Sequence, residues 1–131
     1  MKDRLNALTE QIIGVALNVH DALGTGLLES AYEKCTVFDL VRLGLDVEEQ
    51  KPVPLVYRGE TIPCAFRADI VVNREVIVEV KSVEYLTALH RAQMLSYLRL
   101  TGCRVGLILN FNAKFFTRDG IRRVVNNFPE E

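Results

Sequence analysis

Residues 69–81 read Asp69-Ile-Val-Val-Asn-Arg-Glu-Val-Ile-Val-Glu79-Val-Lys81 and decide the fold. Two apolar runs flank a short polar segment, which is typical of two antiparallel strands joined by a tight turn. Charged side chains are costly to desolvate unless they pair or bind a metal. The two acids and the lysine therefore indicate either a solvent-exposed sheet face or a functional site.

The alternation of side chains along a strand predicts how these two strands pair. Their all-apolar faces must lie together against the core, which requires a three-residue loop, residues 73–75. A two-residue turn would mix the faces. The loop is thus predicted from the faces and not from turn chemistry. This register pairs Val72 with Val76, Ile70 with Val78, Ala68 with Val80 and Asp69 with Glu79, and it puts Phe66, Ala68, Ile70 and Val72 on one face.

Directly opposed residues have Cβ atoms about 5 Å apart, so Asp69 and Glu79 would repel each other. One of them must take up a proton, or a cation must bind. Mg²⁺ or Mn²⁺ is the expected cation because hard ions prefer carboxylate oxygens. Lys81, about 7 Å further along the same face, would hold an anionic oxygen or a water. Such a site suits phosphodiester hydrolysis; the alternative is an exposed Lys–Glu pair.

A helix is predicted for residues 87–101, followed by Gly102. Within it His90, Gln93 and Tyr97 are spaced by three and four, so they form one polar-aromatic column. Because the helix follows Lys81 closely, this column is expected to flank the two acids. Gln93 would orient water or a phosphate, and Tyr97 would hydrogen-bond a nucleic-acid backbone or the lysine. The alternative is a half-buried helix flank. Thr87 and Gly102 are the expected caps.

A second helix is predicted to start after Gly24 and Gly26 and to run to about Leu43. Glu29 and Tyr32 lie in its first turn. Glu29 is either a first-turn acid favoured by the helix dipole or an additional carboxylate that points at the metal. The predicted apolar stripe of this helix comprises Leu28, Ala31, Cys35 and Phe38.

Four motifs follow one another in order: Gly26-x-x-Glu29-x-x-Tyr32, Phe66-Arg-Ala-Asp69, Glu79-Val-Lys81 and His90-x-x-Gln93-x-x-x-Tyr97. Together they resemble the GxxExxY family of the PD-(D/E)xK phosphodiesterase superfamily, from about Val19 to Val125. Ala68 stands at the position before Asp69 where a proline is common.

This resemblance implies a restriction-endonuclease-like α/β core, in which a mixed sheet is flanked by helices in the order helix, strands, helix, strand. It implies Asp69 and Glu79 as metal ligands, with Glu29 as the helix carboxylate that joins them. Lys81 is the implied catalytic lysine. Gln93 and Tyr97 are implied accessory residues of the catalytic site.

The composition suits a small enzyme or binding module. The 131 residues are expected to form one domain, residues 1–131, and the 49% of hydrophobic residues exclude disorder. No apolar run approaches about 20 residues, so no membrane span is expected. The first residues lead into an amphipathic helix and not a signal peptide, which favours a cytoplasmic protein. Cys35, Cys64 and Cys103 are expected to be buried free thiols, and their separation argues against a zinc site.

The remaining segments complete an α/β pattern. The first helix is expected to bury Leu5, Leu8, Ile12, Ala16 and Val19, with His20 packed or capping near its end. Pro52 and Pro54 confine the extended segment Val47–Tyr57 to a sheet edge. The other expected elements are a turn at Arg58-Gly59, a short strand at Glu60–Pro63, a buried strand at 104–110 parallel to the Glu79 strand, a turn at Asp119-Gly120 and a final segment at Ile121–Val125.

The net charge of −1 is unusual for a nucleic-acid binder, but its distribution is uneven. Residues 1–73 contain seven Lys/Arg and eleven Asp/Glu, whereas residues 74–131 contain nine and six. The basic residues of the second half would form either a positive rim beside the site or an ordinary solvated surface. They are Arg91, Arg99, Arg104, Lys114, Arg118, Arg122 and Arg123.

Two functions remain open from the sequence. The first is a Mg²⁺- or Mn²⁺-dependent nuclease, acting on DNA more readily than RNA. The second is a non-catalytic module that binds nucleic acid or protein and retains the nuclease fold. Few phosphate contacts imply weak, salt-dependent binding. A special nucleic-acid structure, a protein partner or a homo-oligomer is therefore expected to contribute.

Overall fold

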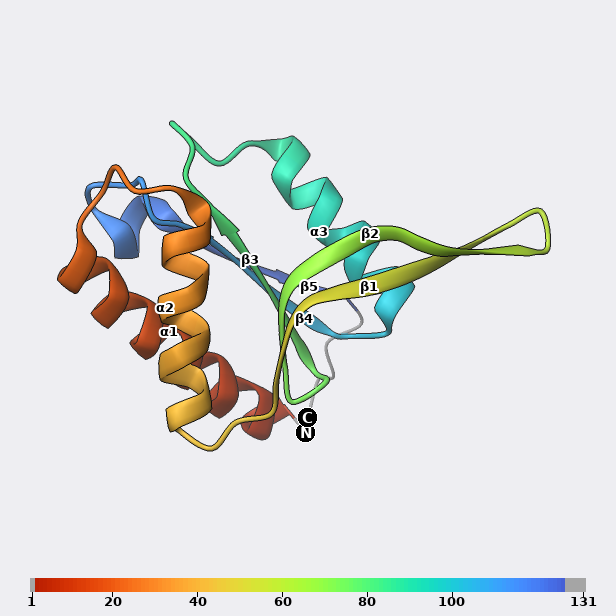
Figure 1. Ribbon diagram of the computed structural model, residues 1–131, viewed down its shortest axis with the longest axis horizontal. Helices are drawn as coiled ribbons and strands as arrows, with labels where there is room; N and C mark the ends of the chain where they lie inside the picture. Colours follow the sequence, from red (N-terminus) through yellow and green to blue (C-terminus); the bar gives the residue numbers. More distant parts are fainter. Residues whose placement is uncertain (1, 127–131) are drawn as a thin grey trace.

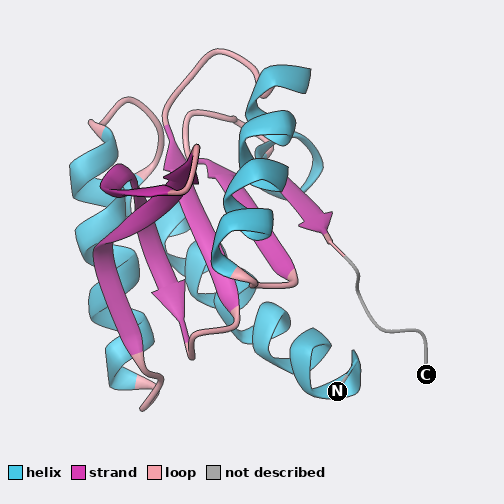
Figure 2. Ribbon diagram, turned by 90° about the vertical axis from the view of Figure 1, so that its right-hand side faces the viewer, coloured by secondary structure: helices cyan, strands magenta, loops and turns pink. Residues whose placement is uncertain are grey.

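The computed structural model describes residues 2–126 and contains a five-stranded mixed sheet flanked by helices on both faces (Figures 1 and 2). This is a restriction-endonuclease-like α/β arrangement. The predicted range 1–131 extends beyond the described residues at both ends. The strands, in their order across the sheet, are β1 Val47–Tyr57, β2 Glu60–Val72, β3 Val76–Lys81, β4 Val105–Asn110 and β5 Ile121–Val125. The helices are α1 Lys2–Leu23, α2 Glu29–Arg42, α3 Ala88–Thr101 and a π-helical turn, Phe116–Gly120.

The sheet separates two hydrophobic cores. On one face α1 and α2 pack against Ile70, Val72, Val78 and Leu107. On the other face α3 packs against residues such as Ile77. Every residue of β4 is buried, because helices cover both faces of this central strand. The five predicted core residues of α1 are all buried, and His20 hydrogen-bonds the Ala113 carbonyl (2.8 Å) and stacks on Phe116.

Several predictions about the strands are confirmed. β1 is an edge strand, β3 and β4 are parallel, and residues 121–125 form the last strand. The loop at residues 73–75 is also confirmed, since Val72 pairs with Val76 and Ile70 with Val78. The ladder ends there, so the predicted direct pairs Ala68–Val80 and Asp69–Glu79 do not form. The short strand expected at Glu60–Pro63 is the beginning of the longer β2.

The prediction that Phe66 and Ala68 share a face with Ile70 is wrong, because both pack in the core on the α3 side. At Asp69 the carboxylate, and not the backbone, accepts the Val80 N–H (2.8 Å). Gln50, opposite this position on β1, has a φ of 54°. These two irregularities interrupt the simple alternation of side chains along β2.

The predicted caps of α3 are confirmed. Thr87 and His90 form a capping box, and Gly102 ends the helix with a φ of 77°. His90 Nδ1 accepts the Thr87 N–H (3.0 Å), which gives this histidine a structural role at the start of α3.

The predicted apolar stripe of α2 is wrong, since Leu28 is 79% and Phe38 61% exposed. The buried residues are Tyr32, Glu33, Thr36 and Leu40. Tyr32 determines this orientation: its hydroxyl donates to the Gly24 carbonyl (2.6 Å) and its ring stacks on Phe111.

The three cysteines are free, as expected, but only Cys103 is buried; Cys35 and Cys64 are exposed. Cys35 lines a groove between α1 and α2, and Cys64 lies in the exposed part of β2. Within residues 2–126, no helix has the length and apolar character needed to cross a bilayer.

Candidate metal-binding and catalytic site

Asp69 and Glu79 come together at the point where β2 separates from β3. Asp69 Oδ2 accepts the Val80 N–H at 2.8 Å, and Glu79 Oε1 lies 3.5 Å from the Asp69 amide nitrogen. Glu79 is only 5% exposed. Burial, followed by the hydrogen bond and negative charge of Asp69, raises the pKa of Glu79 to about 9, against a smaller opposite effect of the Lys81 charge.

The chemistry of these donors fits a hard divalent cation. The buried Glu79 carboxyl and the partly buried Asp69 carboxylate share a site that one proton neutralises only in part, and a cation would replace that proton. Among residues 2–126, no three Asp, Glu, His or Cys side chains gather around one point. Asp69 and Glu79 therefore offer two carboxylates. Mg²⁺ is often bound by one or two carboxylates, with water and substrate phosphate as its other ligands.

Glu29 lies at the same end of β3 but contacts the backbone. Its Oε1 accepts the Ser82 N–H at 3.3 Å, and the Ser82 hydroxyl donates to the Leu27 carbonyl at 3.1 Å. The start of α2 is thus attached to the residue that follows Lys81. Direct ligation of a metal by Glu29 stays a prediction.

Lys81 is the last residue of β3 and pairs with Asn110 of β4. Asn110 is 1% exposed and was not recognised from the sequence. Its amide accepts the Val83 N–H and donates to the Val83 carbonyl, both at 3.0 Å, so it fixes the segment after Lys81. The available signal was a polar residue at the end of an otherwise apolar strand.

Tyr97 and Gln93 differ in their surroundings. Tyr97 stacks on Phe66 with ring centroids 4.0 Å apart. Burial and the negative charges of Glu79 and Asp69 raise the pKa of its hydroxyl, which places Tyr97 beside the carboxylate pair. Gln93, one turn earlier on α3, is exposed, and its side chain has no hydrogen-bond partner within the described chain.

A supporting layer behind Asp69 was missed by the sequence analysis. Gln50 Nε2 donates to both carboxylate oxygens of Glu33 (3.0 Å) and to Asp69 Oδ1 (3.3 Å). Burial and the neighbouring Glu49 carboxyl raise the pKa of Glu33 to about 7, while the hydrogen bond with Glu33 lowers that of Glu49. Glu33 follows Glu29 by one helical turn, but nothing in the sequence links α2 to an edge strand.

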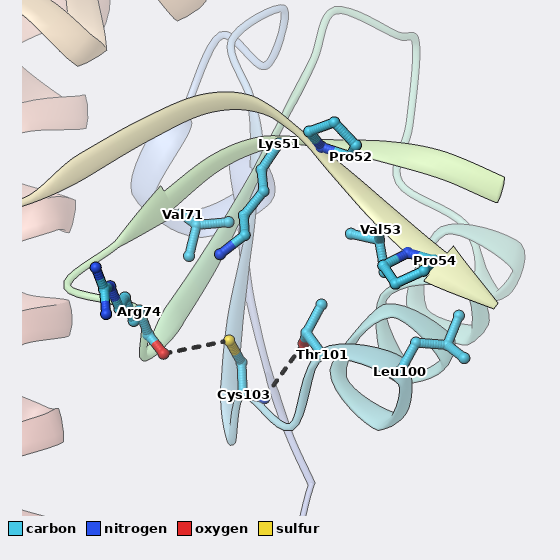
Figure 3. Close-up of a pocket in the computed structure, with 9 residues that line it drawn as sticks. All are labelled: Lys51, Pro52, Val53, Pro54, Val71, Arg74, Leu100, Thr101 and Cys103. Carbon is cyan, nitrogen blue, oxygen red and sulfur yellow. Dashed lines mark hydrogen bonds between the residues drawn. The ribbon is translucent and has the colours of Figure 1, made fainter. Parts of the chain in front are cut away.

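A separate cavity of about 280 Å³ lies between β1 and the end of α3 (Figure 3). Lys51 points into it, and Cys103 donates a weak hydrogen bond to the Arg74 carbonyl (3.7 Å) at its rim. None of its nine lining residues is a candidate site residue. The predicted chemistry therefore belongs to the Asp69–Glu79 pair and not to this cavity.

The comparison with protein families agrees with this geometry. A model of the PD-(D/E)XK nuclease superfamily matches residues 6–124, a range that includes Asp69, Glu79 and Lys81. No curated protein and no solved structure matches the chain significantly. The narrower GxxExxY group stays a prediction. From the match over most of its length and the mixed sheet flanked by helices, the chain belongs to the PD-(D/E)XK nuclease superfamily.

Proposed function

We propose that this protein is a nuclease that uses Mg²⁺ or Mn²⁺ to hydrolyse phosphodiester bonds, in DNA more readily than in RNA. Membership of the superfamily supports nuclease activity. The observation that supports a metal-dependent reaction at this position is the Asp69–Glu79 pair, in which Glu79 is buried and its pKa is raised to about 9 beside Lys81.

In this proposal Asp69 and Glu79 hold the divalent ion, and a bound ion supplies an activated water and neutralises charge on the phosphate. The Lys81 ammonium orients a phosphate oxygen and stabilises its developing negative charge. The hydroxyl of Tyr97 donates a hydrogen bond to the scissile strand, and the exposed Gln93 orients a water or phosphate oxygen. Glu29 holds the Ser82 backbone and thereby the position of Lys81.

The test is cleavage of single-stranded, duplex and branched DNA and of RNA with Mg²⁺ and Mn²⁺. We expect Lys81→Ala and Glu79→Gln to lower the rate at least about 100-fold, as expected for the loss of a group that stabilises the transition state. Lys51→Ala is the control, since Lys51 pairs with Glu48 (3.1 Å) and lies by the other cavity. The proposal fails if wild type cuts no substrate, or if Lys81→Ala cuts as fast as wild type.

The exposed apolar residues of α2 favour a second candidate, a module for binding or assembly. Leu28, the residue before α2, and Phe38 within it are exposed, and Phe38 lines an apolar groove between α1 and α2 with Leu23 and Cys35. A surface of this kind is typical of contact with another protein or a second copy. This candidate predicts that binding is unchanged in Glu79→Gln and that no product forms.

A further inference from the structure

The predicted positive rim separates into distinct places in the fold. Arg104, the residue before β4, lies at the end of the sheet opposite to the Asp69–Glu79 site, in a pocket with Arg4 and Arg74. Arg91 and Arg122, by contrast, line one groove of about 280 Å³ between the start of α3 and β5. Arg91 and Arg122 therefore lie together beside α3, whereas Arg104 belongs to a different part of the surface.

This groove lies on the same face of the sheet as Glu79. Glu79 is paired with Ile108 of β4, and Ile108 is paired with Arg122 of β5. Partners across a sheet point to the same face, so the three side chains form one row. Ile108 is also part of the groove wall. With neighbouring strands about 4.8 Å apart, Arg122 lies about 10 Å from Glu79 across the sheet.

A second groove, of about 390 Å³, continues from the first and shares Leu86 and Arg122 with it. It is lined by further polar and basic groups, including Asn112 and Lys114. Tyr85 stands in its wall with 69% of its surface exposed. An exposed aromatic ring between basic side chains is typical of surfaces on which an unpaired base stacks.

The acids nearby already have partners. Asp119 accepts three hydrogen bonds from Arg118, the shortest at 2.9 Å, and Glu84 accepts the hydroxyl of Tyr85 at 2.8 Å. The hydrogen bonds from Arg118, followed by the positive charges of Arg118 and Arg122, lower the pKa of Asp119. Within the described chain no ion pair involves Arg91, and the only hydrogen bond of the Arg122 side chain is to its neighbour, the Ile121 carbonyl. Both guanidinium groups are thus available to an anion.

We propose that Arg91 and Arg122 bind phosphates of a single nucleic-acid strand that runs from the Asp69–Glu79 site along these two connected grooves. Guanidinium groups suit this task because they form paired, charge-assisted hydrogen bonds with phosphate oxygens. Tyr85 stacks on a base of the same strand. The inference rests on the proposed function for its choice of ligand.

The test is fluorescence anisotropy with a labelled single-stranded DNA of about 20 nucleotides, in EDTA so that no cleavage occurs. We expect the double variant Arg91→Gln, Arg122→Gln to bind about tenfold more weakly, as for the loss of hydrogen bonds to charged groups. In a plot of log affinity against log salt concentration, the slope of the double variant should be smaller in magnitude by about 1.4 than that of wild type. This difference corresponds to two phosphates of a single strand. The single variant Tyr85→Ala should also weaken binding relative to wild type, but without changing the salt dependence.

Arg99→Gln is the matched control, because Arg99 is on the same helix about 12 Å beyond Arg91 and lines neither groove. Thermal unfolding confirms that each variant is folded. The inference is overturned if wild type does not bind, if Arg99→Gln weakens binding as much as the double variant, or if duplex DNA binds more tightly than the single strand.

Cleavage separates this inference from the proposed function. If wild type cuts no substrate but the double variant still loses affinity, the nuclease proposal fails and the grooves remain binding sites. If wild type cuts DNA and the double variant binds and cuts equally well, the grooves are not the binding site and the nuclease proposal stands.

Discussion

Glu79 is the side chain whose ionisation depends most on the fold. It is buried next to Asp69, and its pKa is about 9 in the folded protein against 4.5 for a solvated glutamate. Between these pH values the folded state holds a proton that the unfolded state has lost. The contribution of Glu79 to stability is therefore highest at low pH and falls as the pH rises towards 9, the reverse of the usual behaviour of a salt-bridged carboxylate.

We expect Glu79→Gln to stabilise the metal-free protein at neutral pH, because the amide needs no proton. The gain is about 3 kcal/mol at pH 7, from the 2.5 pH units between 4.5 and 7, and it approaches zero at pH 4.5. The measurement is urea unfolding in EDTA between pH 5 and 8. The pKa of Glu33 is raised to about 7, so Glu33 also makes the stability fall as the pH rises. The Glu79→Gln variant should therefore keep a smaller dependence of stability on pH.

The control for this experiment is Glu84→Gln, which removes an exposed acid near Lys81 and should leave the pH profile unchanged. Excess Mg²⁺ should stabilise wild type more at pH 8 than at pH 6, since the cation displaces the proton. Parallel stability profiles for wild type and Glu79→Gln would contradict the assigned ionisation.

The closeness of Asp69 and Glu79 was predictable from the sequence because the two residues lie on adjacent strands joined by a three-residue loop. Their predicted direct pairing was wrong, since the ladder ends at Ile70–Val78 and the Asp69 carboxylate accepts the Val80 N–H. The contacts of Glu33, Gln50 and Asn110 were not predictable from the sequence. Each of these residues acts through a segment distant in sequence, and a polar residue in an apolar pattern does not reveal its partner.

Among the helices and strands, α3 and β4 pack closely at Gly106. A Cβ atom built on Gly106 would lie 2.7 Å from Met94 Cγ and closer still to its sulfur. Met94 is buried beside Leu98 in the core on the α3 side. The glycine in a central strand therefore allows the helix to approach the sheet.

We expect Gly106→Ala to destabilise the protein by about 1–3 kcal/mol, because the added methyl group overpacks the core. Gly14→Ala is the matched control with the opposite sign. Gly14 lies within α1 with nothing within 4 Å of its added Cβ, so alanine should stabilise by about 1 kcal/mol through helix propensity. Both values come from denaturant unfolding.

A double variant, Gly106→Ala with Met94→Ala, distinguishes steric overlap from a loss of strand flexibility. If overlap is the cause, the double variant is more stable than the sum of the two single changes predicts. Strict additivity would show that Met94 does not oppose the methyl group.

The orientation of α2 shows where the sequence was insufficient for a whole helix. Leu28, Ala31, Cys35 and Phe38 have helical spacing and were expected to face the core. The structure buries Tyr32 with a group of partly polar residues instead, because Tyr32 binds the Gly24 carbonyl and Gln50 binds Glu33. The buried Tyr32 ring, stacked on Phe111, and these hydrogen bonds thus mark the face that α2 buries, whereas apolar periodicity indicates a helix more reliably than the face it buries.

In the molecule as a whole, the sheet extends beyond its helices at one place. β1 and β2 continue past the body as a long hairpin (Figure 1), and the register between them shifts between Val53 and Leu55. Val53 is buried at the base of the hairpin, whereas residues 55–62 are all exposed. The boundary between the packed sheet and the projecting hairpin therefore lies at the register shift.

This boundary predicts that the outer hairpin contributes little to the stability of the fold. Leu55 pairs with Ile62, so replacing residues 56–61 by an Asn-Gly turn keeps this pair and closes the hairpin. The free energy of unfolding should change by less than about 1 kcal/mol, as for exposed positions. Val53→Ala at the buried base should cost about 2 kcal/mol. A loss above about 2 kcal/mol on shortening, measured by urea unfolding, would mean that the outer hairpin packs against the body. Retained metal-dependent cleavage in the shortened protein would separate the hairpin from the chemistry, since Asp69, Glu79 and Lys81 all lie on the body side of the register shift.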